Sequence, residues 1–523
     1  MRRYLWLFLI VLLAGVLRIR NLASYPPGFT PDEAAFGYNA YSLLLTGCDE
    51  WGIPFYKLPL TNLESFGDYK LPLYAFLTVP AVKIFGLNEF ATRLPNAIFG
   101  TLAVLVIFVL AKKTWPKSAS FAALLLAISP WGIQLSRGAF EANLVTMLLP
   151  LFLALFLSKK YFLAGLILVL NFYSYHSARF LSLILVPLFI YKSKNLINNL
   201  FLIILLLPGL LALLGSGGSR STDVSILSPT DGWKAVADRR FEAVQSGLPD
   251  TIARLFSNKA TSLASQFTKN YLSYLSPEFL FNQGAKESTY GLVPGVGVLY
   301  PIEIFFLVAG LIYLIKNPNK FTIYGLLLLF VSIIPAALSK GPGMAANRAA
   351  PELPFLILFS AIGLSVIYKY LPKIFLYFLI TLSLVNFLET YTYHNRDLYH
   401  GMLYGRKETL LRVAGLSHAY QKIFVSRSLS EPHIYVAFFN KLDPVYYQIE
   451  SQKWQKYHDL NLKFLDQYDG YSLGQYTFGS LKFVDSLSLY IGLPQDFPTN
   501  IKPMFTIDYP DSYPAVLVYR KDL

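Results

Sequence analysis

Two adjacent carboxylates, Asp32 and Glu33, follow Pro31 shortly after the first apolar run of the sequence. A carboxylate held at a membrane face can act as a general base and take the proton of an attacking hydroxyl group. The same residues are typical of an ordinary helix start, because proline suits the first helical position and negative charge complements the helix dipole. The pattern supports a catalytic base and a stabilised helix terminus alike.

Four basic residues, Lys70, Arg93, Arg179 and Arg348, lie at the ends of apolar segments. Arginine presents a fork of N–H groups and lysine a point charge, so both can hold a lipid phosphate. Long basic side chains also reach from apolar segments toward lipid headgroups without any ligand. We expect at least two of the four to contact a phosphate. In a further polar segment, Arg137 and Glu141 have the spacing of a helical ion pair.

Eleven apolar runs separate these residues and predict membrane-spanning helices. The runs cover 4–19, 95–111, 118–135, 142–158, 161–175, 179–191, 196–214, 297–315, 321–338, 351–368 and 374–389. Arg2 and Arg3 precede the first run, and a pair of lysines follows each even-numbered one. These pairs are Lys112 and Lys113, Lys159 and Lys160, Lys192 and Lys194, Lys316 and Lys320, and Lys369 and Lys373. Since basic loops stay in the cytoplasm, we expect a cytoplasmic N-terminus in a multi-pass protein of the cell membrane.

The long polar segments then all lie on the outer side. They are 20–94, 215–296, the shorter 339–350 and the tail 395–523. Within the first, Leu71–Phe85 is apolar but contains two prolines and a lysine, and we expect it to lie at the membrane surface. The tail alternates short apolar runs such as 422–426 and 515–519 with turn residues, which predicts strands, and 406–421 predicts an amphipathic helix. We therefore expect a membrane module, 1–394, and a small extracytoplasmic α/β domain, 395–523.

Composition supports a membrane protein. Of the 523 residues 54% are hydrophobic and only 15% are charged, whereas soluble chains have about 25% charged residues. Disorder, collagen-like repeats and a disulfide-stapled scaffold are excluded, and the single cysteine, Cys48, cannot form an intramolecular disulfide. The net charge of +14 is explained first by the basic loops and does not require nucleic acid.

Common soluble-enzyme motifs are missing from the sequence: it contains no P-loop, no His-Glu-x-x-His and no Gly-x-Ser-x-Gly. The middle of the predicted spans is also nearly free of ionisable residues, although a proton-coupled transporter places such residues near the bilayer midplane. A functional site is therefore expected at the outer boundary between water and lipid.

The ordered set of motifs resembles the GT-C superfamily of membrane glycosyltransferases. The likeness is to protein O-mannosyltransferase-like family 39 and to the lipid A aminoarabinose transferases. The motifs that carry it are Pro31-Asp32-Glu33, Lys70-Leu71-Pro72-Leu73-Tyr74, Arg93-Leu94-Pro95, Arg137 to Glu141, Tyr175 to Arg179, Asn347 to Pro351 and Tyr404 to Glu408. The fold class that this implies is an α-helical polytopic membrane protein of about eleven spans with a C-terminal extracytoplasmic α/β domain.

The resemblance also implies a function. The protein would be an inverting glycosyltransferase that moves a hexose or pentose, mannose among them, from a polyprenyl-phosphate-linked donor to an acceptor hydroxyl. It implies Asp32 as the base, with Glu33 orienting the loop or binding acceptor. Lys70, Arg93, Arg179 and Arg348 would bind the donor phosphate, and Arg137, Glu141 and His176 would lie near the acceptor or a metal. Glu141 stands where several relatives use aspartate, so no cofactor is certain and a divalent cation stays open.

Physical chemistry agrees with such a reaction. A polyprenyl phosphate leaves as a stable anion without a general acid, so the site needs one base for the acceptor and cations for the phosphate. Direct attack at the anomeric carbon inverts its configuration. The partners would be the lipid donor, a protein, lipid or glycan acceptor and membrane lipids, but no nucleic acid.

Three other functions stay open at this point. The first is an oligosaccharide transferase or glycan ligase that uses a lipid-pyrophosphate donor. The second is a transporter or flippase, which charges facing a cavity within the membrane would favour. The third is a sensor with a ligand-binding tail, although that function leaves 20–94 and 215–296 unexplained. The sequence names neither the sugar nor the acceptor nor the oligomeric state.

Overall fold

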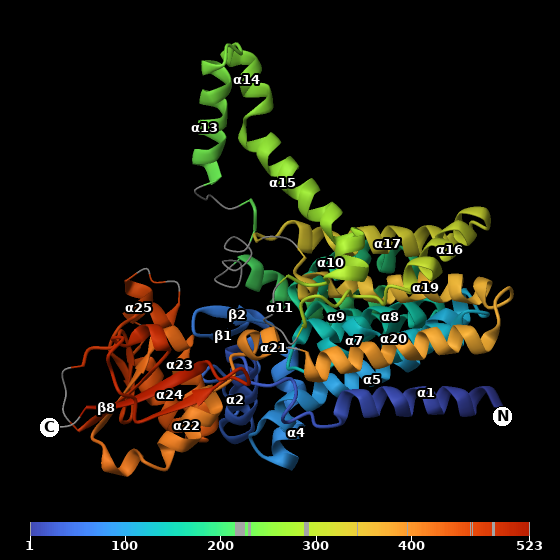
Figure 1. The fold of residues 1–523 in the computed structure, drawn as a ribbon. Coiled ribbons are helices and arrows are strands. Elements are labelled where there is room, and N and C mark those ends of the chain that lie inside the picture. The colour runs from blue at the N-terminus through green and yellow to red at the C-terminus, as the bar shows by residue number, and fades with distance from the viewer. Residues whose placement is uncertain are drawn as a thin grey trace.

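The computed structural model describes residues 2–214, 225–227, 232–286, 292–341, 344–394, 396–454, 456–460, 462, 464–483 and 487–521. The predicted outer segments 215–296 and 339–350 and the predicted boundary at 394–395 therefore lie partly outside the described residues. The chain forms a bundle of apolar helices with a sheet domain at one end (Figure 1).

Each of the eleven predicted spans coincides with a helix of the bundle. In chain order these are α1 (Arg2–Ile19), α5 (Glu89–Thr114), α6 (Ala119–Ile128) with α7 (Pro130–Ser136), α8 (Leu144–Leu157), α9 (Tyr161–Phe172), α10 (His176–Ser193), α11 (Leu196–Leu214), α16 (Glu303–Lys316), α17 (Lys320–Ala337), α19 (Leu353–Ile367) and α20 (Lys373–Tyr393). The predicted fold class is confirmed: the protein is a mostly helical, multi-pass membrane protein with a C-terminal mixed sheet.

Helix length sorts these elements further. The described part of the chain holds five helices long and apolar enough to cross a membrane: α5, α11, α17, the stretch Ala346–Ile367 and α20. A sixth is added if α6 and α7, which meet at 57°, form one broken span. The break has a local cause, because the residue before a proline is pushed out of the helical region, and Ser129 before Pro130 has ψ 127°. The number of spans, eleven, stays a prediction.

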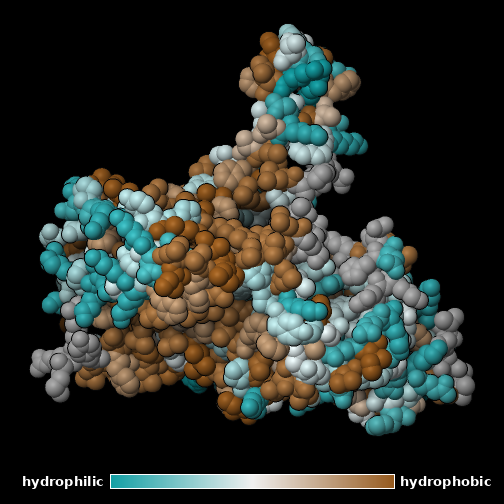
Figure 2. Space-filling view, turned by 180° about the vertical axis from the view of Figure 1, so that it is seen from behind, coloured by the Kyte–Doolittle hydropathy of each residue, from teal (hydrophilic) through white to brown (hydrophobic). Residues whose placement is uncertain are grey.

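The bundle surface is apolar over its length. Figure 2 shows hydrophobic side chains gathered over the helices and hydrophilic ones at both ends of the molecule. Large side chains such as Trp6, Ile197, Phe305 and Ile374 are more than half exposed there. In water such a surface would drive association, so lipid is the solvent that this belt fits.

Between α1 and α5 the chain forms a compact layer, which we call the outer layer because it lies on the predicted outer side of the bundle. Its elements are α2 (Pro31–Thr46), α3 (Leu58–Thr61), β1 (Leu63–Ser65), β2 (Asp68–Lys70) and α4 (Leu73–Phe85). The strands form a hairpin in which Leu63 faces Lys70, closed by Phe66 and Gly67, both with positive φ. Such a two-residue turn matches the twist of the strands, so the hairpin fixes where Lys70 lies. The apolar segment predicted at the membrane surface is α4.

The C-terminal sheet domain is mixed and six-stranded, in the order β4-β5-β3-β6-β8-β7. Its strands are β3 (Lys422–Ser426), β4 (Tyr471–Leu473), β5 (Tyr476–Gly479), β6 (Ser488–Gly492), β7 (Phe505–Asp508) and β8 (Pro514–Lys521). Its longer helices are α22 (Arg406–Ala414), α23 (Pro432–Phe439) and α24 (Pro444–Gln452). The predicted strands at 422–426 and 515–519 are confirmed as β3 and part of β8. The helix predicted over 406–421 is shorter, since α22 ends at Ala414 before Gly415.

Helix α2 lies between the bundle and the sheet domain. A Cβ atom on Gly37 would lie 2.5 Å from the Phe438 ring of α23 and 2.5 Å from the Thr92 hydroxyl of α5, so only glycine fits there. The Tyr435 hydroxyl donates to the Phe29 carbonyl at 2.8 Å, and Tyr38 donates to the Leu442 carbonyl at 3.1 Å. The first outer segment thus shares a core with the end of the chain.

A helical arm, α13 (Gly232–Gln245), α14 (Asp250–Phe256) and α15 (Lys259–Tyr274), stands away from both the bundle and the sheet domain (Figure 1). Helix α15 starts at Asn258, whose side chain accepts from the Thr261 N–H at 3.0 Å in a capping box. Its base packs near α17, where Asn270 donates to the Ala337 carbonyl at 3.2 Å.

The orientation of the bundle is testable with reporters. The alternating lysines predict that the chain is outside the cytoplasm after α20 and inside it after α16. A reporter active only outside the cytoplasm should work when fused after residue 395 and fail when fused after residue 317. A reporter active only in the cytoplasm should give the opposite pattern. Cytoplasmic activity after residue 395 would reverse the orientation.

Candidate active site

Asp32 and Glu33 lie side by side in the first turn of α2 but face different surroundings. Thr30 caps the helix, and its hydroxyl accepts from the Glu33 N–H while the Glu33 carboxylate accepts from the Thr30 N–H. Glu33 is fully buried, whereas 27% of the Asp32 side chain is exposed. The predicted helix start is present. Of its two carboxylates, only Asp32 is accessible to solvent.

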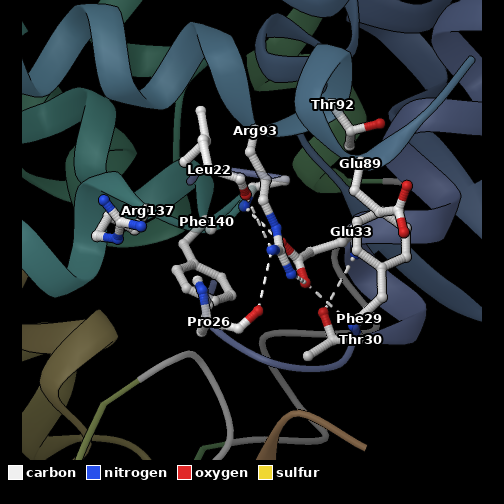
Figure 3. Close-up of polar contacts among 12 residues, drawn as sticks. Leu22, Pro26, Phe29, Thr30, Glu33, Glu89, Thr92, Arg93, Arg137 and Phe140 are labelled. Carbon is white, nitrogen blue, oxygen red and sulfur yellow. Dashed lines mark hydrogen bonds and ion pairs between the residues drawn. The ribbon is translucent and has the colours of Figure 1, made fainter. Parts of the chain in front are cut away.

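Glu33 forms a buried ion pair with Arg93 (Figure 3). The Arg93 Nε donates to Glu33 Oε1 at 2.8 Å and its Nη2 donates to Oε2 at 3.2 Å. The remaining N–H groups of Arg93 donate to the carbonyls of Leu22, Pro26 and Gly28. All five N–H groups are thus engaged and both side chains are inaccessible. The structure places Arg93 with Glu33 and leaves it no N–H for a donor phosphate.

This pair holds the outer layer on the bundle. Glu33 Oε1 also accepts from the Ala139 N–H at 3.0 Å, so one carboxylate joins α2, α5 and the segment after α7. A carboxylate with these partners orients the loop, one of the two roles expected for Glu33. It is a positioning residue for Asp32.

Removing one partner of this pair should destabilise the protein. Arg93→Met leaves the Glu33 charge buried without its partner, which typically costs about 3–5 kcal/mol. We expect a clearly lower midpoint of thermal unfolding in detergent. The double variant Glu33→Gln with Arg93→Met removes both charges and should recover part of that loss, and Lys83→Met, at an exposed lysine, should change little. An unfolding midpoint of Arg93→Met equal to wild type would contradict the positioning role.

Lys70 meets Asp32 at the end of the hairpin. Its Nζ lies 2.9 Å from Asp32 Oδ1 and 3.0 Å from Asp68 Oδ2, and 4.3 Å from the centre of the Phe66 ring. Only 1% of the Lys70 side chain is exposed. Because the ammonium group is buried between two carboxylates, extension of the side chain toward lipid headgroups does not explain the position of Lys70.

The start of α10 brings two further predicted residues to the same hairpin. His176 Nε2 lies 3.2 Å from the Tyr69 carbonyl, which can only accept, so this nitrogen carries a proton. Arg179 Nη2 donates to Asn62 Oδ1 at 3.3 Å, next to β1. The Nε and Nη1 groups of Arg179 are buried and have no hydrogen-bond partner among the described residues. Buried cationic N–H groups without a partner are suited to an anion.

Arg348 approaches α10 from the segment before α19. The Ser177 hydroxyl donates to the Arg348 carbonyl at 2.8 Å, and Arg348 Nη1 donates to the Lys340 carbonyl at 3.0 Å. The structure thus brings Asp32, Lys70, His176 and Arg179 around one hairpin, with the Arg348 backbone beside the start of α10. We call Asp32, Lys70, His176, Arg179 and Arg348 the hairpin cluster.

Arg137 and Glu141 do not share a helix. Helix α7 ends at Ser136, and Glu141 opens a separate 3-10 turn, Glu141–Asn143. The helical ion pair inferred from their spacing was therefore wrong in its geometry. Arg137 donates to the carbonyls of Leu17, Arg20 and Tyr25 at the end of α1. Figure 3 shows it apart from the Glu33–Arg93 pair.

Two buried carboxyl groups near the hairpin cluster were not found from the sequence. Burial and nearby Asp466 raise the pKa of Glu431 well above its usual range, while Lys70 partly opposes the shift. Burial likewise raises the pKa of Glu50 to about 8. Glu431 precedes α23 in the sheet domain, and the centre of the His433 ring in α23 lies 6.4 Å from the centre of the Phe66 ring, so the C-terminal domain reaches the hairpin. Glu431 stands alone in the sequence, whereas Glu50 follows Asp49 in a second adjacent carboxylate pair that the sequence analysis did not single out.

Metal ligands do not cluster in the described residues: no group of three or more His, Cys, Asp and Glu side chains has a geometry that could hold an ion. The expectation of an acceptor or metal near Arg137, Glu141 and His176 stays a prediction.

The helices from Lys70 to the end of α11 can be compared with known families. Residues 70–215 match the family of dolichyl-phosphate-mannose-protein mannosyltransferases. This match confirms the resemblance over less than a third of the chain. It includes Lys70, His176 and Arg179 of the hairpin cluster, whereas Asp32 and Arg348 lie outside the part matched to the mannosyltransferase family.

Three solved structures are similar to most of the chain at low identity. The oligosaccharyltransferase of Archaeoglobus fulgidus is 15% identical with a TM-score of 0.46, and the match covers 83% of this chain and 61% of that protein. ArnT from Cupriavidus metallidurans in the apo state is 10% identical with a TM-score of 0.42, and the match covers 99% of this chain and 98% of that protein. The same ArnT bound to undecaprenyl phosphate is 12% identical, TM-score 0.47, covering 98% of both chains. Among curated protein sequences none matches this chain.

Proposed function

We propose that the protein is an inverting glycosyltransferase. It moves a sugar from a polyprenyl-phosphate-linked donor to an acceptor hydroxyl on the outer face of the membrane. The observation that carries the proposal is the Asp32–Lys70 contact of 2.9 Å at a hairpin that Arg179 also contacts, with buried N–H groups that have no partner among the described residues. An accessible carboxylate and buried cations around one hairpin are the groups that this reaction needs.

Each group then has a role. The acceptor oxygen attacks the anomeric carbon and loses its proton to Asp32, while the bond from that carbon to the phosphate oxygen breaks. Negative charge grows on the departing phosphate, where Lys70 and Arg179 stabilise it. Arg348, whose backbone contacts the start of α10, is proposed as a third cation for the phosphate. Glu33 and Arg93 keep the start of α2 in place and touch neither substrate.

The donor class is supported by the matched family, whose name gives a dolichyl-phosphate-linked mannose as its donor. A polyprenyl chain is as apolar as the belt around the helices, so a donor of this kind reaches the hairpin cluster from within the membrane. From the matched family we infer only the donor class for this protein, and neither the mannose nor the protein acceptor. The sugar therefore remains a hexose or pentose, and the acceptor remains a protein, lipid or glycan hydroxyl.

Two measurements test the proposal. Mass spectrometry of glycoproteins and glycolipids from cells with and without the protein should show one sugar that disappears with it. The purified protein, given a polyprenyl-phosphate-linked sugar and the acceptor so identified, should release polyprenyl phosphate. Release of a lipid pyrophosphate from a pyrophosphate-linked donor would favour a glycan ligase instead. Unchanged glycans in both cell extracts, with lipid moved across vesicles, would favour a flippase.

A further inference from the structure

A groove of about 610 Å³ lies between α1 and α20, apart from the hairpin cluster. Its apolar lining comes from Val16, Leu17, Ile133, Val385 and Leu388. Its polar lining includes Arg20, Asn21, Ser24, Arg137, Glu389 and Thr392. None of the residues of the hairpin cluster lines it.

The groove is amphipathic along its length. Helices α1 and α20 run in the same direction, and both end at the side that carries the sheet domain (Figure 1). Val16 and Leu17 precede Arg20 on α1, and Val385 precedes Glu389 and Thr392 on α20. The apolar part therefore lies deeper in the bundle and the polar part at its outer end. A membrane lipid has the same division into chain and headgroup.

Arg137 forms the inner wall at the polar end. Its Nη1 donates to the Leu17 carbonyl and its Nη2 to the Arg20 carbonyl, both at 2.8 Å, so it caps the end of α1. Only 5% of the residue is exposed. Its Nε is buried and has no hydrogen-bond partner in the described part of the chain. A buried cationic donor without a partner costs free energy unless an anion approaches it.

The remaining charges agree with an anionic headgroup. Arg20 is exposed at the polar end, so it can turn toward a ligand in the groove. The one carboxylate of the lining, Glu389, lies 2.8 Å from His394 Nδ1 and so has a partner of its own. Two arginines thus face one carboxylate that is already engaged.

We propose that the groove between α1 and α20 binds a membrane lipid with a phosphate headgroup. The lipid chain lies against Val16, Leu17, Val385 and Leu388, and the phosphate faces Arg20 and Arg137. A diacyl phospholipid and a polyprenyl phosphate share this chemistry. The site is distinct from the hairpin cluster, and its occupation requires no sugar and no transfer.

Native mass spectrometry of the full chain in a mild detergent tests the proposal. Phosphatidylglycerol, undecaprenyl phosphate and phosphatidylcholine are each titrated, and the lipids retained per chain are counted. Arg20→Gln should weaken retention of one anionic lipid about tenfold, as expected for losing a charge-assisted hydrogen bond. Val385→Trp should have at least the same effect by filling the apolar part. Both substituted side chains are exposed, so neither variant should impair folding, and Arg137 is left intact as the cap of α1.

Matched controls separate the groove from the general surface. Leu382→Trp places the same side chain on α20 at an exposed residue outside the lining, and Lys83→Gln removes an exposed positive charge elsewhere. Both should retain anionic lipid as the wild type does. The anionic lipid that both groove variants lose identifies the occupant. Equal retention of phosphatidylcholine, or groove variants indistinguishable from their controls, would overturn the proposal, and neither result depends on glycosyl transfer.

Discussion

Asp32→Asn is expected to lower the rate of sugar transfer by roughly 10²–10⁴, the usual cost of losing a general base. The amide has the shape of the carboxylate but cannot take the acceptor proton. Asp32 is partly exposed, and in the variant the Lys70 ammonium group still pairs with Asp68, so the variant should fold as the wild type does. The measurement is the single-turnover rate with saturating donor, alongside the unfolding midpoint in detergent.

Asp68 supplies a matched control for this experiment. Its carboxylate lies 3.0 Å from the same Lys70 ammonium group, so Asp68→Asn removes an equal charge from the same cation. If Asp32 is the base, Asp68→Asn should lower the rate far less than Asp32→Asn. Equal losses in the two variants would mean that Asp32 acts only by holding Lys70, and wild-type turnover of Asp32→Asn would remove it from the reaction altogether.

Lys70→Met should lower turnover by about 10²–10³, the range observed when one donor that stabilises developing charge is removed. Methionine keeps an unbranched side chain of nearly the same length but lacks the ammonium group, and with it the contact of Nζ with the Phe66 ring. Arg179→Met should act in the same direction, because its buried Nε and Nη1 groups have no hydrogen-bond partner among the described residues and are cationic donors near the hairpin. The rates of both variants are measured at saturating donor, with donor affinity measured separately.

The exposed lysine of α4 serves as the comparison. Lys83→Met makes the same chemical change outside the hairpin cluster and should transfer sugar at the wild-type rate. A normal rate in Lys70→Met would mean that Lys70 only pairs with Asp32 and Asp68 and does not stabilise the phosphate. Normal rates in both Lys70→Met and Arg179→Met would leave the phosphate without its proposed partners.

The sequence predicted what depends on local pattern. Runs of apolar residues bury or face lipid wherever they occur, so the eleven helices were found to within a few residues. The start at Pro31 and the strands at 422–426 and 515–519 follow from neighbours only a few positions away. The resemblance, which is ordered along the chain, selected nine candidate site residues. The structure brings four of them, Asp32, Lys70, His176 and Arg179, to one hairpin, and their roles stay a prediction.

The sequence could not predict contacts between residues that lie far apart along the chain. Arg93 has the same residue type and the same kind of position as Arg179. Arg93 pairs with Glu33, sixty residues earlier, whereas Arg179 keeps buried N–H groups that have no partner among the described residues. Nothing local distinguishes them. Glu431 illustrates the same limit, because its neighbourhood with Lys70 exists only once the sheet domain has packed against α2.

The position of α2 has a consequence for how the protein is made. Helix α2 is translated about four hundred residues before Phe438 and Tyr435, which pack against Gly37 and Phe29. Strand β8, which lies between β6 and β7 in the sheet that supports them, is translated later still. Insertion into the membrane can therefore proceed helix by helix while Asp32 still lacks its final setting. A chain that stops short of β8 would reach the membrane without an assembled site, so synthesis itself delays the chemistry until the sheet domain is present.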